Sequence, residues 1–172
     1  MAVTAVMLGA AGCSSGEGDG GDAKASASPR PQGTGPLTKG IVRADLDTSV
    51  ADAGVLANAP EYAQNFERSP TGSKPSCTVA FKGFGTDTNP VDLARFEVLV
   101  GELRERAWQQ PGDRKERKDR DGVIGVAEVV LKQRGWRMVA EYQSIPEEGV
   151  ITLMAFDEAC MKKYGTNTGP VS

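Results

Sequence analysis

Residues 89–112 read NPVDLARFEVLVGELRERAWQQPG, and this stretch decides the fold class. Its apolar side chains recur at three- and four-residue spacing, which places them on one face of a helix. Asn89 is the expected cap, Pro90 fits the first helical position, and the Pro-Gly pair at the end must stop the helix. We therefore expect one long amphipathic helix, with Glu102 on its wet side. The apolar face consists of Leu93, Phe96, Leu99, Val100, Leu103 and Ala107.

The chain after this helix predicts an antiparallel meander. Residues 119–122 form a hairpin-type turn between a polar, basic arm and the apolar stretch 123–132. Turns at 134–135 and 146–149 then separate two further strands, the last of which spans 150–156. The apolar stretch also fits a helix, because periodicity does not separate a buried helix from a strand. Its Val and Ile content favours the strand.

The chain before the helix holds shorter elements. Residues 41–46 favour a short strand, and residues 47–55 are Ala-rich enough for a brief helix. Pro60 starts a second short helix, and residues 77–82 are β-branched and aromatic, as in a strand. The sequence thus predicts an α+β fold, in which an antiparallel sheet of about four to five strands packs against the one long amphipathic helix.

The N-terminal part has a different composition. Residues 14–36 contain no aromatic and no branched aliphatic side chain, so they cannot bury enough apolar surface to offset chain entropy. We expect a disordered spacer up to residue 37 and a single domain over 38–172. The formal net charge of −3 gives no reason to expect nucleic-acid binding.

Residues 1–12 are small and apolar and lead into Cys13. The run Ala10-Ala11-Gly12-Cys13 resembles the end of a lipoprotein signal peptide, as in the envelope lipoproteins of high-GC Gram-positive bacteria. The resemblance implies that residues 1–12 are a signal-peptide remnant and that Cys13 carries a palmitate-type lipid. It also implies a cell-membrane location on the extracytoplasmic face, with the spacer as tether.

The signal departs from the lipoprotein pattern in two places. Ala10 stands where a larger aliphatic residue is usual, and no positively charged segment precedes the apolar run. Both departures would disappear if translation began upstream, so we expect the true start before Met1. The apolar run itself is too short to span a bilayer.

The chain has three cysteines, Cys13, Cys77 and Cys160. If Cys13 is lipidated, the other two can pair, because unpaired thiols are disfavoured outside the cytoplasm. Their ends meet if the strand that Cys77 opens and the strand that Cys160 follows are antiparallel neighbours. A cytosolic protein with two structural thiols and one incidental thiol is the alternative.

Few residues point to catalysis. The chain has no histidine, which removes Ser-His-Asp and Cys-His schemes and most zinc sites, and we expect no cofactor and no metal. Residues 83–88 follow a strand and precede a helix but lack the third glycine of a dinucleotide loop and a Walker lysine. We interpret them as a connection that needs glycine dihedrals. The acid pairs that could serve glycoside hydrolysis are Asp87 with Asp92, Glu147 with Glu148, and Asp157 with Glu158.

Two further groups have a structural and a functional interpretation. Residues 113–121 carry Glu116, Asp119 and Asp121 among five basic residues. The basic residues would repel calcium, so we favour a solvated, salt-bridged arm over an ion or polyanion site. Three aromatic side chains suit either a sugar- or peptide-binding face or the core, and the shared parity of the last two on one strand favours the core. They are Trp108, Trp136 and Tyr142.

These features favour a lipid-anchored extracytoplasmic binding or accessory module of unknown specificity. Its partners would be the membrane, through the lipid, and an envelope protein or cell-wall polymer. A carboxylate-based cell-wall hydrolase is the alternative, which a cleft with two facing acids would promote. A third interpretation is an accessory subunit of a transporter or secretion complex, which a large apolar patch would favour.

Overall fold

The computed structural model describes residues 35–145 and 148–164. The expected signal remnant, Cys13 and most of the spacer lie outside the described residues, and so does Glu147. Within the described part of the chain, no helix is both long and apolar enough to cross a bilayer. The helices are α1 (Lys39–Asp52), α2 (Pro60–Glu67), the short 3₁₀ helix η1 (Lys74–Cys77), α3 (Leu93–Glu105) and α4 (Glu158–Lys163).

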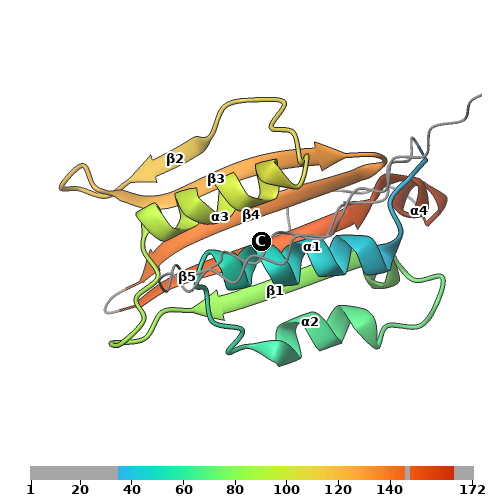
Figure 1. Cartoon of the computed structure of the whole chain (residues 1–172), viewed down its shortest axis with the longest axis horizontal. Coiled ribbons are helices and arrows are strands. Elements are labelled where there is room, and N and C mark those ends of the chain that lie inside the picture. Colours follow the sequence, from blue (N-terminus) through green and yellow to red (C-terminus); the bar gives the residue numbers. More distant parts are fainter. Residues whose placement is uncertain (1–34, 146–147, 165–172) are drawn as a thin grey trace, which may run out of the picture. The chain divides into compact units, whose positions relative to one another are not determined.

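The strands form one five-stranded antiparallel sheet in the order β1-β5-β4-β3-β2 (Figure 1). The α+β class and the antiparallel meander are confirmed, and the stretch that also fitted a helix is strand β3. The first of the described strands, β1, pairs only with the last, β5, and the meander ends at β2. Strands β1 and β2 are therefore the two edges of the sheet. The strands are β1 (Thr78–Phe84), β2 (Lys115–Lys118), β3 (Ile124–Gln133), β4 (Trp136–Ile145) and β5 (Glu148–Asp157).

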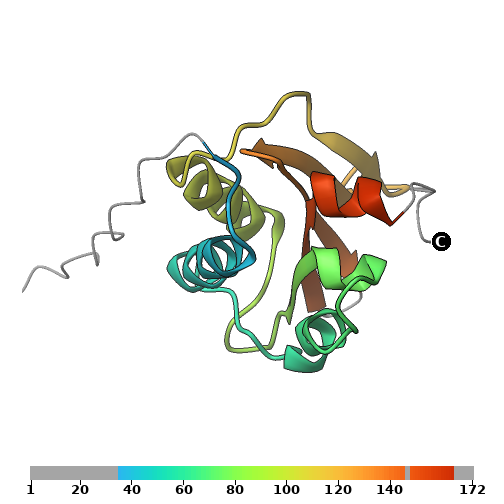
Figure 2. The ribbon, with the colours of Figure 1, turned by 90° about the vertical axis from the view of Figure 1, so that its right-hand side faces the viewer.

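Two helices, not one, cover a face of the sheet. Figure 2 shows α1 and α3 side by side on the same face, so the prediction of a single long helix is wrong. The strand expected at 41–46 is part of α1, because Val42, Leu46 and Val50 recur every four residues and are at most 4% exposed. Burial of this face outweighs the strand preference of β-branched residues.

The helix caps differ from the sequence prediction. Asp92, not Asn89, caps α3, because its carboxylate accepts a hydrogen bond of 2.8 Å from the Arg95 backbone N–H. Asn89 instead closes the preceding loop, where it exchanges backbone hydrogen bonds of 3.1 Å with Thr86. Glu102, expected on the wet side of α3, is 7% exposed and pairs with the Arg106 guanidinium at 3.3 Å.

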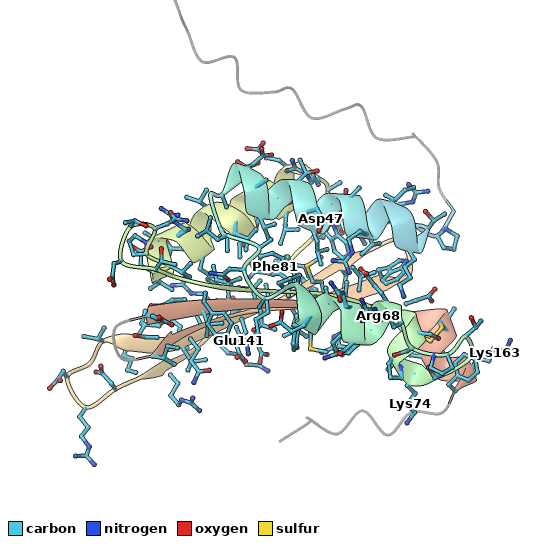
Figure 3. All side chains as sticks on the ribbon, turned by 90° about the horizontal axis from the view of Figure 1, so that it is seen from below. Asp47, Arg68, Lys74, Phe81, Glu141 and Lys163 are labelled. Carbon is cyan, nitrogen blue, oxygen red and sulfur yellow. A yellow bond between two sulfur atoms is a disulfide. The ribbon has the colours of Figure 1, made fainter. Side chains whose placement is uncertain are left out.

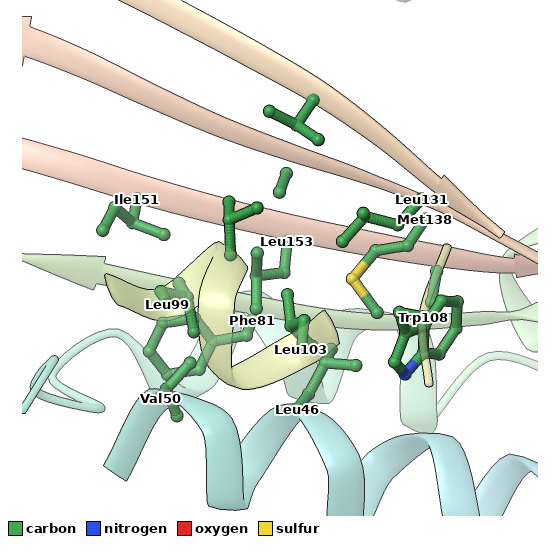
Figure 4. Packing of buried hydrophobic residues seen from close by; sticks show 14 of the residues in the cluster. Leu46, Val50, Phe81, Leu99, Leu103, Trp108, Leu131, Met138, Ile151 and Leu153 are labelled. Atoms are coloured by element: carbon green, nitrogen blue, oxygen red, sulfur yellow. The ribbon is translucent and has the colours of Figure 1, made fainter. Parts of the chain in front are cut away.

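The core lies between the two helices and the sheet (Figure 4). The Trp108 indole N–H donates to Asp45 Oδ2 over 3.0 Å, and the Trp136 indole N–H donates to the Leu37 carbonyl over 2.8 Å. All three aromatic residues belong to the core and are at most 6% exposed, as their shared parity had predicted for Trp136 and Tyr142. Large side chains of the core are Leu46, Val50, Phe81, Leu99, Leu103, Trp108, Leu131, Met138, Ile151 and Leu153.

A disulfide joins Cys77 at the end of η1 to Cys160 in α4, as predicted from the strand ends. Because β1 and β5 are antiparallel neighbours, the start of one lies beside the end of the other, and the two Cα atoms are 5.6 Å apart. The bridge spans 83 residues and so closes most of the described domain into one loop.

Candidate functional site

A groove lies between α1, α2 and the edge strand β1, with a volume of about 220 Å³. Small side chains of α2 and of the segment before it line part of its wall, and charged groups line the rest. Figure 3 labels Asp47 on α1 and Phe81 on β1, which both line the hollow. We call it the Arg43 groove and define it by Arg43, Asp47, Gln64, Glu67, Phe81 and Lys82.

Arg43 connects the three elements of the groove. Its guanidinium donates to the Ala80 carbonyl of β1 over 2.9 Å. It lies 3.6 Å from the carboxylate of Asp47, one turn further along α1, and it pairs with Glu67 at the end of α2. The side chain of Arg43 is 22% exposed, whereas those of Asp47 and Glu67 are 57% and 44% exposed. The two carboxylates therefore keep surface that a ligand can reach.

The groove is lined by two cations, Arg43 and Lys82, and by two carboxylates, so its formal charges sum to zero. The charges are unevenly placed, because Asp47 and Glu67 both pair with the Arg43 guanidinium while the Lys82 ammonium lies over the rings of Tyr62 and Phe84. Partial burial raises the pKa of Asp47 above its ordinary value, the Arg43 guanidinium opposes this rise, and the charge of Glu67 adds to it. A cationic group of a ligand would relieve the crowding of negative charge.

The backbone of β1 forms the third part of the site. The Gly85 N–H donates to the Gly149 carbonyl over 2.8 Å, so odd-numbered residues of β1 point their N–H and C=O groups toward β5. Even-numbered residues point their backbone N–H and C=O groups away from the sheet. The Arg43 side chain hydrogen-bonds to the backbone of Ala80, and the Asn58 side chain hydrogen-bonds to the backbone of Phe84.

Lys82 lies between these two covered positions and lines the groove. Among the described residues, nothing hydrogen-bonds to its backbone N–H or C=O. Its ammonium group turns to two aromatic rings, 5.5 Å from the centroid of Tyr62 and 5.2 Å from that of Phe84. The outer edge of β1 therefore offers one residue with an available donor and acceptor.

Three members of the acid pairs considered from the sequence have structural roles: Asp92, Asp157 and Glu158. Asp92 caps α3, and Asp157 caps α4 by accepting from the Cys160 N–H over 2.9 Å. Glu158 lies 3.8 Å from the Lys132 ammonium, and Asp87 is exposed in the loop before α3. None of these described residues lines the Arg43 groove. Glu148 borders another hollow, and Glu147, its pair, lies outside the described residues.

The sequence analysis missed Asp47 and Glu67 as a pair. The available signal was the four-residue spacing of Arg43 and Asp47, which suits an ion pair on a helix. That signal was hidden because residues 41–46 were interpreted as a strand. No local signal places Glu67 beside them, since it comes from a different helix.

Gly83 and Phe84 end strand β1, and residues 85–88 belong to the expected strand-to-helix connection. The glycines here serve a different purpose from the one expected. Gly83 and Gly85 are not among the described glycines with positive φ. They are needed for close approach, because a Cβ at Gly83 would lie 2.4 Å from the Leu56 carbonyl oxygen, and one at Gly85 would lie 2.7 Å from the Val91 nitrogen.

The basic arm around β2 is solvated and salt-bridged, as favoured from the sequence. Arg114 pairs with Glu97 at 2.7 Å and with Glu116, and the Lys115 ammonium lies 3.1 Å from Glu128. The Asp119 carboxylate accepts from two backbone N–H groups of its own turn, each at 2.9 Å. No cluster of three or more potential metal ligands occurs among the residues that the structure describes.

The sheet face away from α1 and α3 is a second surface of interest. The register places Val130, Val139 and Met154 in one row across three strands. Each of them is half-buried, so the row is not a large exposed apolar patch. The large apolar residues that are exposed in the described chain, Leu56 and Val98 among them, lie on separate segments.

Comparison with known proteins adds no assignment: no family model, no curated protein and no solved structure matches the chain. The chemistry of the groove therefore rests on its own residues. Its described lining holds no serine, threonine or cysteine. It can bind through charge, through the Gln64 amide and through the backbone of Lys82.

Proposed function

We propose that this chain is a lipid-anchored extracytoplasmic binding module whose ligand occupies the Arg43 groove. The observation that supports binding is the charge arrangement, in which one guanidinium serves two half-exposed carboxylates at the rim of a hollow. A few fixed polar groups around a concave surface are what orient a ligand in a binding site. The ligand would belong to an envelope protein or to a cell-wall polymer.

The proposed location has separate support. Cys13 follows a run of small apolar residues and precedes a spacer without core-forming side chains, as a tethered lipoprotein requires. The disulfide between Cys77 and Cys160 fits an oxidising compartment. The lipid would supply the membrane contact, which leaves the groove available for the ligand.

Photo-crosslinking in intact cells tests the proposal. A diazirine side chain replaces Gln64, which lines the groove, and a matched variant carries the same group at Gln143, which is exposed on β4. We expect an adduct from position 64 that is absent from position 143. The adduct should weaken when Glu67→Gln is added, because this change removes one of the two half-exposed carboxylates of the groove. Equal labelling from both positions, or none from position 64, would overturn the proposal.

A second candidate function, carboxylate-based hydrolysis of a wall polymer, has one observation in its favour. Asp47 and Glu67 face the same hollow, and the pKa of Asp47 is raised by partial burial, as a general acid requires. Incubation of purified cell wall with the protein, with Asp47→Asn and with Glu67→Gln separates the two functions. If the unchanged protein releases soluble wall fragments and either substitution abolishes this release, the chain is a hydrolase and not a binding module.

A further inference from the structure

We propose that the Arg43 groove recognises a short, extended peptide segment with a basic side chain, held by main-chain hydrogen bonds to Lys82 and by the carboxylates of Asp47 and Glu67. The inference rests on the proposed function, because it assumes that the groove is the binding site, and it names the chemical class of the ligand.

The main-chain part follows from the geometry of an edge strand. A residue whose N–H and C=O point out of a sheet pairs with an extended backbone, which supplies one acceptor and one donor at the matching spacing. Lys82 is such a residue, and it lines the groove. A ligand without a peptide-like donor and acceptor would leave one of these groups without a partner in the complex.

The neighbours of Lys82 limit the length of the segment. Arg43 occupies the Ala80 carbonyl at 2.9 Å, and the Asn58 amide both donates to and accepts from the Phe84 backbone, at 2.9 Å and 2.8 Å. These side chains occupy the positions where a longer added strand would make its next hydrogen bonds. The edge therefore accepts one residue of a ligand and excludes addition of a full strand.

The charge part follows from the two carboxylates. Asp47 and Glu67 share a single guanidinium and keep 57% and 44% of their side-chain surface exposed. A lysine or arginine of the ligand would give these two carboxylates a second cationic partner. The ammonium of Lys82 lies over the rings of Tyr62 and Phe84, at 5.5 Å and 5.2 Å from their centroids.

The size of the hollow agrees with one side chain of a peptide. Its volume of about 220 Å³ lies below the roughly 300–1,000 Å³ usual for pockets that hold a drug-sized molecule. Ala59, Pro60 and Ala63 line it with small apolar surface. Such surface suits the aliphatic stem of a lysine while the charged head reaches the carboxylates.

Titration of the ¹⁵N-labelled full chain, oxidised and with Cys13→Ser to prevent lipidation, tests the inference by NMR. The probes are acetyl-Ala-Lys-Ala-amide, its norleucine analogue, its analogue methylated at every main-chain nitrogen, and n-butylammonium chloride. We expect the lysine peptide to shift the Lys82 amide signal and to bind about fivefold more tightly than the norleucine peptide, as a half-exposed ion pair allows. The methylated peptide should not shift this signal.

Matched variants locate the charge effect. Glu67→Gln should remove the preference for lysine over norleucine, whereas Glu158→Gln should keep it, since Glu158 is equally exposed at 43% but lies on α4. Binding of n-butylammonium in the groove with no preference for the unmethylated peptide would overturn the peptide inference and leave the proposed function standing. Signal shifts confined to another surface, or no shifts with any probe, would also overturn the peptide inference. The crosslinking experiment would still test independently whether the groove is a binding site.

Discussion

The two edges of the sheet are protected in different ways. The β2 edge is four residues long, all of them exposed, and it carries charged side chains with ion pairs to its neighbours. The β1 edge is seven residues long and mostly buried, and Arg43, Asn58 and α2 cover it. Short, charged strands and covered strands both prevent edge-to-edge aggregation. The covered edge, however, leaves the backbone of Lys82 available, so the proposed recognition site lies on a protected edge.

The largest effect should come from the disulfide that joins the start of β1 to the end of β5. Replacement of Cys77 and Cys160 by alanine removes a cross-link over 83 residues, and in the chain-entropy model this costs about 4–5 kcal/mol. Urea unfolding of the oxidised protein and of the double variant measures the difference. Equal midpoints and equal slopes for the two proteins would contradict the role we give to the bridge.

Matched arginine substitutions at the two edges sharpen the comparison. Arg43 and Arg114 are 22% and 31% exposed, and each pairs with two carboxylates, but Arg43 also donates to a strand carbonyl. We expect Arg43→Met to lower the free energy of unfolding by about 1–3 kcal/mol, because it leaves a strand carbonyl without its partner. Arg114→Met should cost at most about 1 kcal/mol, as an exposed ion pair does.

Chemical denaturation of both variants in the same buffer gives the comparison. A cost for Arg114→Met as large as that for Arg43→Met would show that the two edges are protected equally. It would also remove the reason to treat the β1 edge as special.

The sequence predicted the sheet better than it predicted the helical layer. β4 was correctly placed because Trp136, Met138, Ala140 and Tyr142 recur at every second residue, and a period of two has one structural interpretation. Residues 41–46 are rich in β-branched side chains and were assigned to a strand. Their helix is stabilised by packing against α3 and the sheet, which a local pattern does not contain.

The candidate site was beyond sequence reasoning for a related reason. Its parts come from α1, α2 and β1, and the distance between Asp47 and Glu67 in the chain gives no sign that one guanidinium binds both. Lys82 was recognised as part of a strand, but its role depends on β1 being an edge. That position follows from the pairing of β1 with β5, which is fixed by the complete sheet.

A smaller effect should follow from Asn58→Ala. The substitution removes both hydrogen bonds between the Asn58 side chain and the Phe84 backbone, at 2.8 Å and 2.9 Å, and we expect a cost of about 1–2 kcal/mol. Hydrogen exchange localises the change: the Phe84 amide should exchange faster, while the Gly85 amide, bonded to Gly149 across the sheet at 2.8 Å, should keep its protection. Unchanged exchange at Phe84 would show that Asn58 does not cover the edge.

The smallest effect concerns the pH dependence of Asp47. Because partial burial raises its folded-state pKa above the ordinary value of 3.8, the folded protein binds more protons than the unfolded chain just above that value. The contribution of Asp47 to stability is therefore favourable at low pH and is lost as the pH rises through the folded pKa. Relative to the wild type, Asp47→Asn should gain stability over this window and level off above it.

Paired urea titrations of the wild type and Asp47→Asn between acid and neutral pH measure this difference. A wild type that gains stability over the variant as the pH rises would show that Arg43 lowers the pKa of Asp47 more than burial raises it. The proposal that the groove prefers a cation would then lose one of its supports.

The account depends most on the claim that this domain works outside the membrane, tied to it by Cys13. Intact-mass spectrometry of the protein extracted from native membranes, alkylated with and without prior reduction, tests this claim directly. We predict a diacyl or triacyl mass on an N-terminal Cys13 and two alkylations that appear after reduction, from Cys77 and Cys160. An unlipidated chain with three freely alkylated thiols would contradict both the location and the disulfide.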